Sequence, residues 1–156
     1  MHRIILSFLL LLFACQPIVP ERQKHLLHSL GSVTVTFVID GDTLITNVGK
    51  VRLVGIDAPE KGDCGYEEAG KRLRELSIGK TVTLVDDVRQ PDRDTYGRLL
   101  RYVEIDGEDV ATVLLRDGFV RAFPWIPSGR LSVYRELELK AKEKGIGVLW
   151  AECNEK

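Results

Sequence analysis

Three short runs of mainly apolar residues, separated only by tight turns, constrain the fold of this chain more than any other feature of its sequence. The run VTVTFVI at 33–39 alternates apolar and polar residues, TLITN at 43–47 follows a Gly-Asp turn, and VRLVGI at 51–56 follows the turn at Gly49. A period of two residues with glycine-rich turns is typical of strands joined by hairpins. The segment therefore predicts a three-stranded meander.

The spacing of apolar residues changes after this meander, and the later elements are marked by the following residues. A first helix is marked by Tyr66, Ala69, Leu73 and Leu76, with Gly79 as its C-cap. Two strands follow, TVTLV at 81–85 and RLLRYVEI at 98–105. A second helix is marked by Val110, Val113 and Leu114 before Gly118, and a third by Tyr134, Leu137 and Ala141. The predicted order is βββαββαα. It matches an α+β domain built on a five-stranded OB-fold barrel, a partly open barrel often used to hold oligonucleotides.

The length and charge of the chain limit what it can be. The 156 residues, 44% of them hydrophobic and 29% charged, are enough for one globular domain with a core and too few for two of normal size. The formal net charge is −1, so the chain is not a broadly basic nucleic-acid coat. An anionic ligand must therefore be held by a local cluster of cations.

The N-terminal segment MHRIILSFLLLLFAC has a short positive start, an apolar run and a small residue before its cysteine. This layout predicts a signal peptide at 1–14, because the run is too short for a comfortable membrane span. LFAC resembles a prokaryotic lipobox, so we expect lipidation of Cys15, a tether over 15–32 and a folded domain at 33–153. The protein is then exported and anchored on the extracytoplasmic side of a membrane, with plain secretion as the alternative.

The two remaining cysteines, Cys64 and Cys153, would face an oxidising compartment in an exported protein. An even pair in that setting predicts a disulfide, and two unpaired buried thiols are the alternative. Such a bond would close a loop of about 90 residues and contribute on the order of 4 kcal/mol in the chain-entropy model. It would tie the segment after Glu60 to the C-terminal tail.

The predicted domain has no histidine, because the last one in the chain is His28 in the tether. Triads that depend on imidazole, and zinc sites with histidine ligands, are therefore excluded from it. Acid–base chemistry in this domain must therefore be carried out by carboxylates, water or a less usual group. The acidic residues to weigh are Asp40 and Asp42 in IDGDT, Asp57 and Glu60 in IDAPE, and Asp94 in DRDTYGR.

The meander should gather several of these groups at one rim of the barrel. Asp42 lies at the first turn and Asp57 at the end of the third predicted strand, which a hairpin places side by side. Oxygen donors without nitrogen or sulfur suit a hard cation, calcium or magnesium, and carbonyls and waters favour calcium. Arg52, on the same predicted strand as Asp57, and Arg98 present planar donors that fit phosphate oxygens. The combination predicts a phosphoryl-transfer site.

Three motifs, IDGDT at 39–43, VRLVGIDAPE at 51–60 and DTYGRLLRYV at 94–103, resemble in order and spacing the staphylococcal nuclease (thermonuclease) family. The resemblance covers about residues 33–150. Each motif is only moderately specific, but three in register are strong. The resemblance implies a five-stranded OB barrel with three helices that hydrolyses DNA and RNA with calcium.

The resemblance also implies roles for single residues. Asp42 and Asp57 match the carboxylates that bind calcium, and Ala58 stands where the family, usually with threonine, supplies a main-chain carbonyl. Asp40 matches an acid that supports the metal ligands. Glu60 matches the proposed general base for the attacking water, a role still argued over within the family.

Arg52 and Arg98 match the family's phosphate-binding pair, with Arg98 also placed to assist the departing 5′ oxygen, so that cleavage leaves 3′-phosphates. Two features depart from the family. The loop after the general base is short and contains Cys64, and the segment RAFPWIP at 121–127 replaces downstream tyrosines that stack on the nucleotide. Phe123 or Trp125 could supply a stacking face, or could pack for shape alone.

Each of these residues also has a structural explanation. Asp42 could shape a tight turn, Arg52 could be a surface strand residue, Arg98 could form an ion pair with Asp94, and Glu60 could be a solvated loop acid. All of these explanations together would require a coincidence of spacing.

Three function classes follow from the sequence. The favoured one is a monomeric calcium-dependent nuclease acting on DNA, RNA or both. The second is an OB-type module that binds single strands without cutting, and the third is a glycosidase using Asp57 and Glu60. The arginines serve no clear purpose in a glycosidase, and retention of every expected catalytic residue argues against a non-catalytic module.

Overall fold

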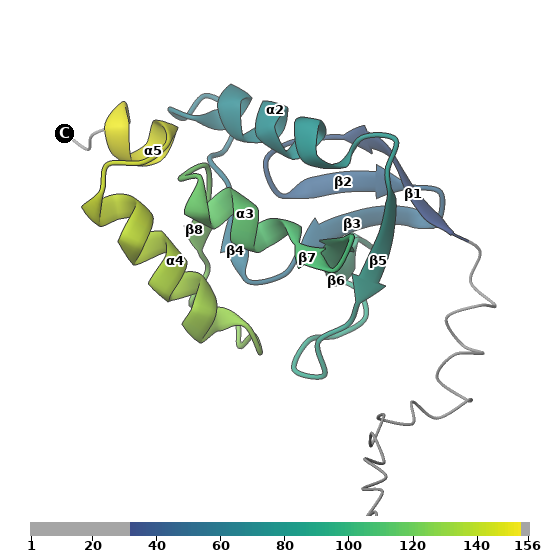
Figure 1. The fold of residues 1–156 in the computed structure, drawn as a ribbon. Coiled ribbons are helices and arrows are strands. Elements are labelled where there is room, and N and C mark those ends of the chain that lie inside the picture. Colours follow the sequence, from purple (N-terminus) through teal and green to yellow (C-terminus); the bar gives the residue numbers. More distant parts are fainter. Residues whose placement is uncertain (1–31, 154–156) are drawn as a thin grey trace, which may run out of the picture. The chain divides into compact units, whose positions relative to one another are not determined.

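The computed structural model describes residues 32–153 (Figure 1). The predicted signal peptide, Cys15 and the tether up to residue 31 lie outside the described residues. Within 32–153, none of the helices combines the length and the apolar character needed to cross a bilayer.

Five strands form the barrel that the sequence predicts. They are β1 (Val33–Val38), β2 (Thr43–Thr46), β3 (Gly49–Leu53), β5 (Thr81–Val85) and β6 (Leu99–Ile105). Antiparallel pairing joins β3 to β2, β2 to β1, β1 to β5 and β5 to β6. The barrel closes where β3 pairs with β6 in parallel, with Arg52 opposite Leu100. The α+β, five-stranded architecture is therefore confirmed.

Within residues 32–153, the three predicted helices accompany the barrel, and a fourth, of one turn, follows them. They are α2 (Tyr66–Ser77), α3 (Val110–Arg116), α4 (Leu131–Glu143) and the additional α5 (Val148–Ala151). The helix α3 contacts α2, α4 and β6, so it lies in the middle of the helical side (Figure 1). The C-cap of α2 is Ile78, one residue before the predicted Gly79, which follows with a φ of 72°.

The third predicted strand, 51–56, is wrong as a continuous element. The strand β3 ends at Leu53, the chain turns at Val54 and Gly55, and a separate strand β4 (Ile56–Asp57) pairs antiparallel with β8 (Arg121–Ala122). Residues on both sides of the turn are buried, so the apolar run continues through it and conceals it in the sequence. Arg52 and Asp57 therefore lie on different strands. The short strands β7 (Glu108–Asp109) and β8 were also not predicted, because two residues show no periodicity.

A single hydrophobic core joins the barrel to the helices. Its fully buried side chains include Leu44 and Val103 from the strands, Leu73 from α2, Leu114 from α3 and Tyr134 from α4. Because every long helix contributes to this core, the barrel and the helices form one cooperative unit. Asp42, Arg52, Asp57 and Arg98 stand on or directly beside strands of this unit, whereas Glu60 lies in a loop.

The predicted disulfide between Cys64 and Cys153 is present, with a Cα–Cα distance of 5.6 Å. It joins the loop before α2 to the residues after α5, and Figure 1 shows these two helices end to end on the same side of the molecule.

Asp87, in the loop after β5, ties that loop to the segment before α4. Its Oδ2 accepts hydrogen bonds from the Tyr102 hydroxyl at 2.5 Å and from the Gly129 N–H at 2.7 Å, and its Oδ1 accepts one from the Arg89 N–H at 2.9 Å. The carboxylate is almost fully buried. Burial acts to raise the pKa of Asp87, but these hydrogen bonds outweigh it and lower the pKa from 3.8 to about 2.

We expect Asp87→Asn to lower the free energy of unfolding by about 2 kcal/mol at neutral pH, because the depressed pKa measures the preference of the folded state for the ionised carboxyl. The unfolded chain binds this proton more tightly, so the contribution is complete above about pH 4 and is lost as the pH falls through about 2. The difference in unfolding free energy between the two proteins should shrink over that range. Denaturant unfolding at a series of pH values measures it.

The matched control is Asp86→Asn, because the exposed Asp86 side chain makes no hydrogen bond or ion pair with the described residues. A loss of stability that does not depend on pH would contradict the assigned role of the Asp87 carboxylate.

Candidate active site

The pairing of β2 with β3 brings two predicted site residues, Asp42 and Arg52, close together. Thr43 lies opposite Arg52 in this pair, and the Leu53 N–H donates a hydrogen bond to the Asp42 carbonyl at 2.8 Å. Asp42, the residue directly before β2, is therefore placed beside the Arg52 side chain. The turn that carries it is tightly packed, since a Cβ on Gly41 would lie 2.7 Å from the Cβ atoms of both Ala58 and Ala69.

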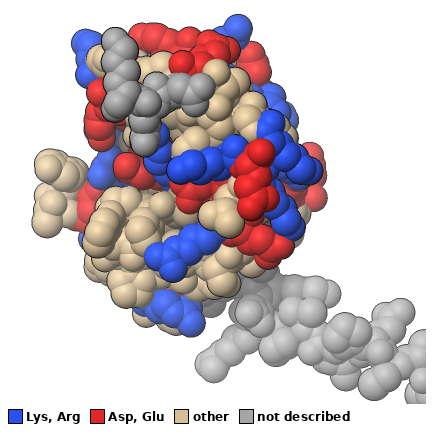
Figure 2. All heavy atoms as spheres, turned by 90° about the vertical axis from the view of Figure 1, so that its left-hand side faces the viewer, with Lys and Arg blue, Asp and Glu red and all other residues tan. Residues whose placement is uncertain are grey.

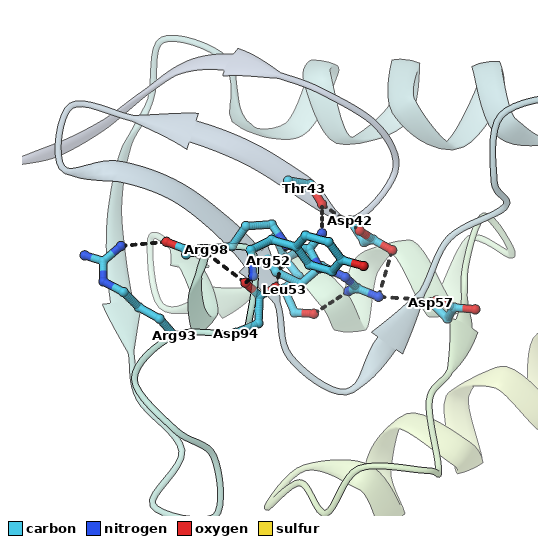
Figure 3. A network of polar contacts seen from close by, with 10 residues as sticks. Asp42, Thr43, Arg52, Leu53, Asp57, Arg93, Asp94 and Arg98 are labelled. Atoms are coloured by element: carbon cyan, nitrogen blue, oxygen red, sulfur yellow. Dashed lines mark hydrogen bonds and ion pairs between the residues drawn. The ribbon is translucent and has the colours of Figure 1, made fainter.

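Arg52 joins the two carboxylates that the sequence assigns to a metal ion (Figure 3). Its Nη2 lies 3.0 Å from Oδ2 of Asp42 and 3.3 Å from Oδ1 of Asp57, and its Nη1 donates to the Leu53 carbonyl at 2.7 Å. Both acids thus stand at one rim of the barrel, although Asp57 reaches it from β4 rather than from the strand of Arg52.

Asp42 is the most buried charged group of this cluster, with 7% of its surface exposed. Its Oδ2 accepts a hydrogen bond from the Ala58 N–H at 3.0 Å and its Oδ1 accepts one from the Thr43 hydroxyl at 2.9 Å. The Asp42 N–H in turn donates to Oδ1 of Asp40 at 3.1 Å. Burial raises the pKa of Asp42 to about 6, even though the charge of Arg52 and the Ala58 N–H act to lower it.

Arg98 stands directly before β6 and is held by Asp94. Asp94 accepts hydrogen bonds from Nε of Arg98 at 2.6 Å and from its main-chain N–H at 2.9 Å. Partial burial acts to raise the pKa of Asp94, but these bonds hold it below its ordinary value. Nη1 of Arg98 donates to the Thr43 hydroxyl at 3.2 Å, whereas Nη2 makes no hydrogen bond with the described residues. One donor edge of this guanidinium therefore remains available.

The sequence reasoning missed two residues of the site. The Thr43 hydroxyl donates to Asp42 and accepts from Arg98, so it joins the carboxylate cluster to the second arginine (Figure 3). Tyr96 is 84% exposed, and the guanidinium carbon of Arg98 lies 5.5 Å from its ring centroid. Both residues stand inside quoted motifs, next to Asp42 and within two residues of Arg98. Proximity to predicted site residues is the signal that could have found them.

A pocket of about 240 Å³ opens beside the two arginines. Its lining is mostly apolar and consists of Arg52, Leu53, Val54, Gly55, Ile56, Gln90, Asp94, Tyr96, Arg98, Leu100, Phe123 and Ile126. Of the two predicted stacking residues, Phe123 is part of this wall, whereas Trp125 is 82% exposed and is not. The pocket therefore combines cationic donors with a flat aromatic and aliphatic surface.

Residues 50–152 match the protein-family model described as staphylococcal nuclease homologue. The chain belongs to the staphylococcal nuclease family. Two relatives come from Bacillus subtilis (strain 168). The SPbeta prophage-derived endonuclease YokF is 35% identical over 131 residues, covering 76% of this chain and 44% of YokF. Endonuclease YncB is 36% identical over 140 residues, covering 82% of this chain and 64% of YncB.

Thermonuclease of Staphylococcus intermedius is 32% identical over 129 residues, which cover 76% of this chain and 76% of that enzyme. The chain thus spans less than two thirds of the two Bacillus proteins and about three quarters of the thermonuclease.

Glu60, which the resemblance to the staphylococcal nuclease family singles out as a base, lies in the loop beyond β4 and Pro59. Its side chain is exposed, and it makes no hydrogen bond or ion pair with the described residues. It is not part of the pocket lining. The Glu60 carboxylate is therefore accessible to water.

The oxygen atoms at this site can be compared with the ligands that a hard cation such as calcium requires. No group of three or more acidic, histidine or cysteine side chains within 32–153 is arranged to hold a metal by itself. Two carboxylates do meet at Arg52, and one of them, Asp42, is buried. A donor set made of oxygens alone fits calcium, provided that carbonyls and waters complete it.

Proposed function

We propose that this chain is a calcium-dependent nuclease that hydrolyses phosphodiester bonds of DNA, RNA or both. The single observation that carries the proposal is that Arg52 and Arg98 line one pocket, at a rim where Asp42 and Asp57 also meet. Membership of the staphylococcal nuclease family supports it, as do relatives named endonuclease and thermonuclease. Neither a sugar-cleaving enzyme nor a purely structural network needs two guanidiniums beside an apolar pocket.

Calcium would be held by Asp42, Asp57 and the main-chain carbonyl of Ala58, and when bound it would supply positive charge that counters the charge developing on the phosphate oxygens. Arg52 would then exchange the two carboxylates for phosphate oxygens, a pair of which can likewise accept two parallel N–H bonds from a guanidinium. Asp40 would hold the Asp42 turn in place through its hydrogen bond to the Asp42 N–H.

Glu60 would accept a proton from the attacking water as the water oxygen bonds to phosphorus. The bond from phosphorus to the 5′ oxygen would break with its electron pair going to that oxygen, which takes up a proton from solvent water, so that a 3′-phosphate and a 5′-hydroxyl are left. Arg98 would donate hydrogen bonds to the phosphate oxygens and to the departing 5′ oxygen through the donor edge that is not used internally. Each fixed donor of this kind contributes roughly 3 to 4 kcal/mol to lowering the barrier.

The apolar wall of the pocket suits a nucleobase. Phe123 lines it and Tyr96 stands at its edge, so both offer a face for stacking, and Trp125 could do so from outside the pocket. Acidic and basic side chains lie side by side on the face that carries α4 and α5 (Figure 2), so the surface there offers no broad attraction to a polyanion. Affinity should come from the site itself.

The setting of this activity is proposed to be extracytoplasmic. The disulfide between Cys64 and Cys153 supports export, because such bonds persist in oxidising compartments. A lipid on Cys15 would anchor the protein to a membrane, and secretion without an anchor is the alternative. Intact-mass measurement of the membrane fraction distinguishes them, and we expect the enzyme to act as a monomer.

The decisive experiment is digestion of single-stranded DNA, duplex DNA and RNA by the purified protein, with calcium and with a calcium chelator. We expect cleavage with calcium, loss of cleavage with the chelator, and products that carry 3′-phosphates. Undiminished cleavage in the chelator would reject the proposed cofactor. Binding of single strands without cleavage would instead favour the non-catalytic module.

A further inference from the structure

The Glu60 carboxylate has no partner that fixes its position. Residues 60–64 are exposed to solvent, and the Glu60 side chain makes no hydrogen bond or ion pair with the described residues. The main chain is held locally, since the Asp63 N–H donates to the Glu60 carbonyl at 2.9 Å and the Tyr66 N–H donates to the Asp63 carbonyl at 3.3 Å. The chain before Glu60 is held by the Ala58 N–H, which donates to Asp42, so the remaining freedom of Glu60 is set by what anchors the loop that follows it.

The loop is anchored at its far end to α5. Gly65 is buried there with a φ of 88°, and a Cβ on it would lie 3.2 Å from Cγ1 of Val148 and 3.3 Å from Cδ2 of Leu149. The neighbouring Cys64 is bonded covalently to Cys153. The close approach of Gly65 to Val148 and Leu149, and the disulfide to Cys153 just after α5, thus connect the loop that carries Glu60 to the C-terminal part of the domain.

The helix α5 is itself docked on the body of the domain. The Leu149 N–H donates to the Gly118 carbonyl at 3.2 Å, and Val148 and Leu149 are buried. The Cys153 N–H donates to the Val148 carbonyl at 2.9 Å, which fixes the cysteine relative to the helix. The disulfide therefore connects the exposed loop to an element with a defined place in the fold.

We propose that the Cys64–Cys153 disulfide is a positioning element for Glu60, so that removing it lowers the rate of the chemical step in addition to any effect on stability. This inference rests on the proposed function, in which Glu60 activates the attacking water. A short displacement of a catalytic group lowers the rate steeply, and the contribution of a general base sets the upper limit of the loss. Neither Cys64 nor Cys153 lines the pocket, so the disulfide acts on the reaction only through Glu60.

The test compares kcat in four full-length proteins: wild type, Glu60→Gln, the double variant Cys64→Ser/Cys153→Ser, and the combination of all three substitutions. We expect the double variant to lose about 10- to 100-fold in kcat while KM and the calcium dependence change little. In the Glu60→Gln background, removing the disulfide should cause no further loss. A merely structural disulfide would lower kcat by the same factor in both backgrounds.

Two controls separate an effect on stability from an effect on the chemical step. All assays are run well below the melting temperature of each variant, with folding verified by circular dichroism. Val113→Ala is the matched control, because it removes buried volume from α3 without touching the loop, and it should lower the melting temperature and leave kcat unchanged.

If the serine variants fail to fold, the wild-type protein is reduced with dithiothreitol, which transfers two electrons and two protons to the disulfide and itself becomes a cyclic disulfide. The loss of kcat should then be reversed by reoxidation. Unchanged kcat after complete reduction, or an equal loss in both backgrounds, would overturn the inference and leave the proposed function standing. Full activity of Glu60→Gln would overturn both.

Discussion

Arg98→Lys is expected to lower kcat by about 10²- to 10³-fold, which is the loss measured when one fixed donor to a developing oxyanion is removed. The structure gives the reason. Nε of Arg98 donates to Asp94 and Nη1 donates to Thr43, so that Nη2 of the same planar guanidinium remains available for a phosphate oxygen. A lysine ammonium keeps the charge but cannot bind Asp94 and phosphate in this geometry. Steady-state cleavage of a short DNA or RNA substrate measures the effect.

Arg116→Lys is the matched control for this prediction, because Arg116 is 56% exposed on α3 and pairs with Glu108 at the surface. It should leave kcat unchanged. If Arg98→Lys retained wild-type kcat, the ion pair with Asp94 would be the whole role of Arg98, as in the structural explanation.

Glu60→Gln is expected to lower kcat by about 10²- to 10⁴-fold, the usual contribution of a general base. Glutamine has nearly the same shape, and the carboxylate makes no hydrogen bond or ion pair with the described residues, so the melting temperature should not change. A large loss of activity at constant stability would separate a chemical role from a structural one. Single-turnover cleavage, with circular dichroism melts alongside, provides both measurements.

The control for Glu60→Gln is Glu67→Gln, which makes the same charge change on the exposed first turn of α2. It should behave as wild type. Comparable activity losses in both variants would point to a general electrostatic effect of the acidic segment, and would contradict the proposed role of Glu60.

The sequence predicted the barrel well because its strands carry local signals. Alternating residues and glycine turns define β1, β2 and β5 nearly to the residue, and apolar spacing defines the long helices. The break between β3 and β4 escaped prediction because buried valine and isoleucine continue through the turn. The pairing of β4 with β8 escaped it because two-residue strands are fixed by tertiary contacts alone.

The candidate site, like the fold, was predicted only in part from the sequence. Hairpin geometry was enough to predict that Asp42 and Asp57 would meet at one rim of the barrel, since it places the start of one strand beside the end of the next. The bridging role of Thr43 was not predictable, because it depends on a hydroxyl reaching Arg98 from another part of the chain. The pairing of Arg52 with both acids likewise requires coordinates, since residue types alone do not specify which partner a guanidinium takes.

The parallel contact between β3 and β6 has a consequence for when activity can appear. It places Arg52 opposite Leu100, close to Arg98, yet these arginines belong to segments far apart along the chain. Contacts between such remote segments carry a large loop-closure cost and are typical of slow steps in folding. Arg52 and Arg98 should therefore come together with the final closure of the barrel, so that a newly made polypeptide stays catalytically silent until its tertiary structure is complete.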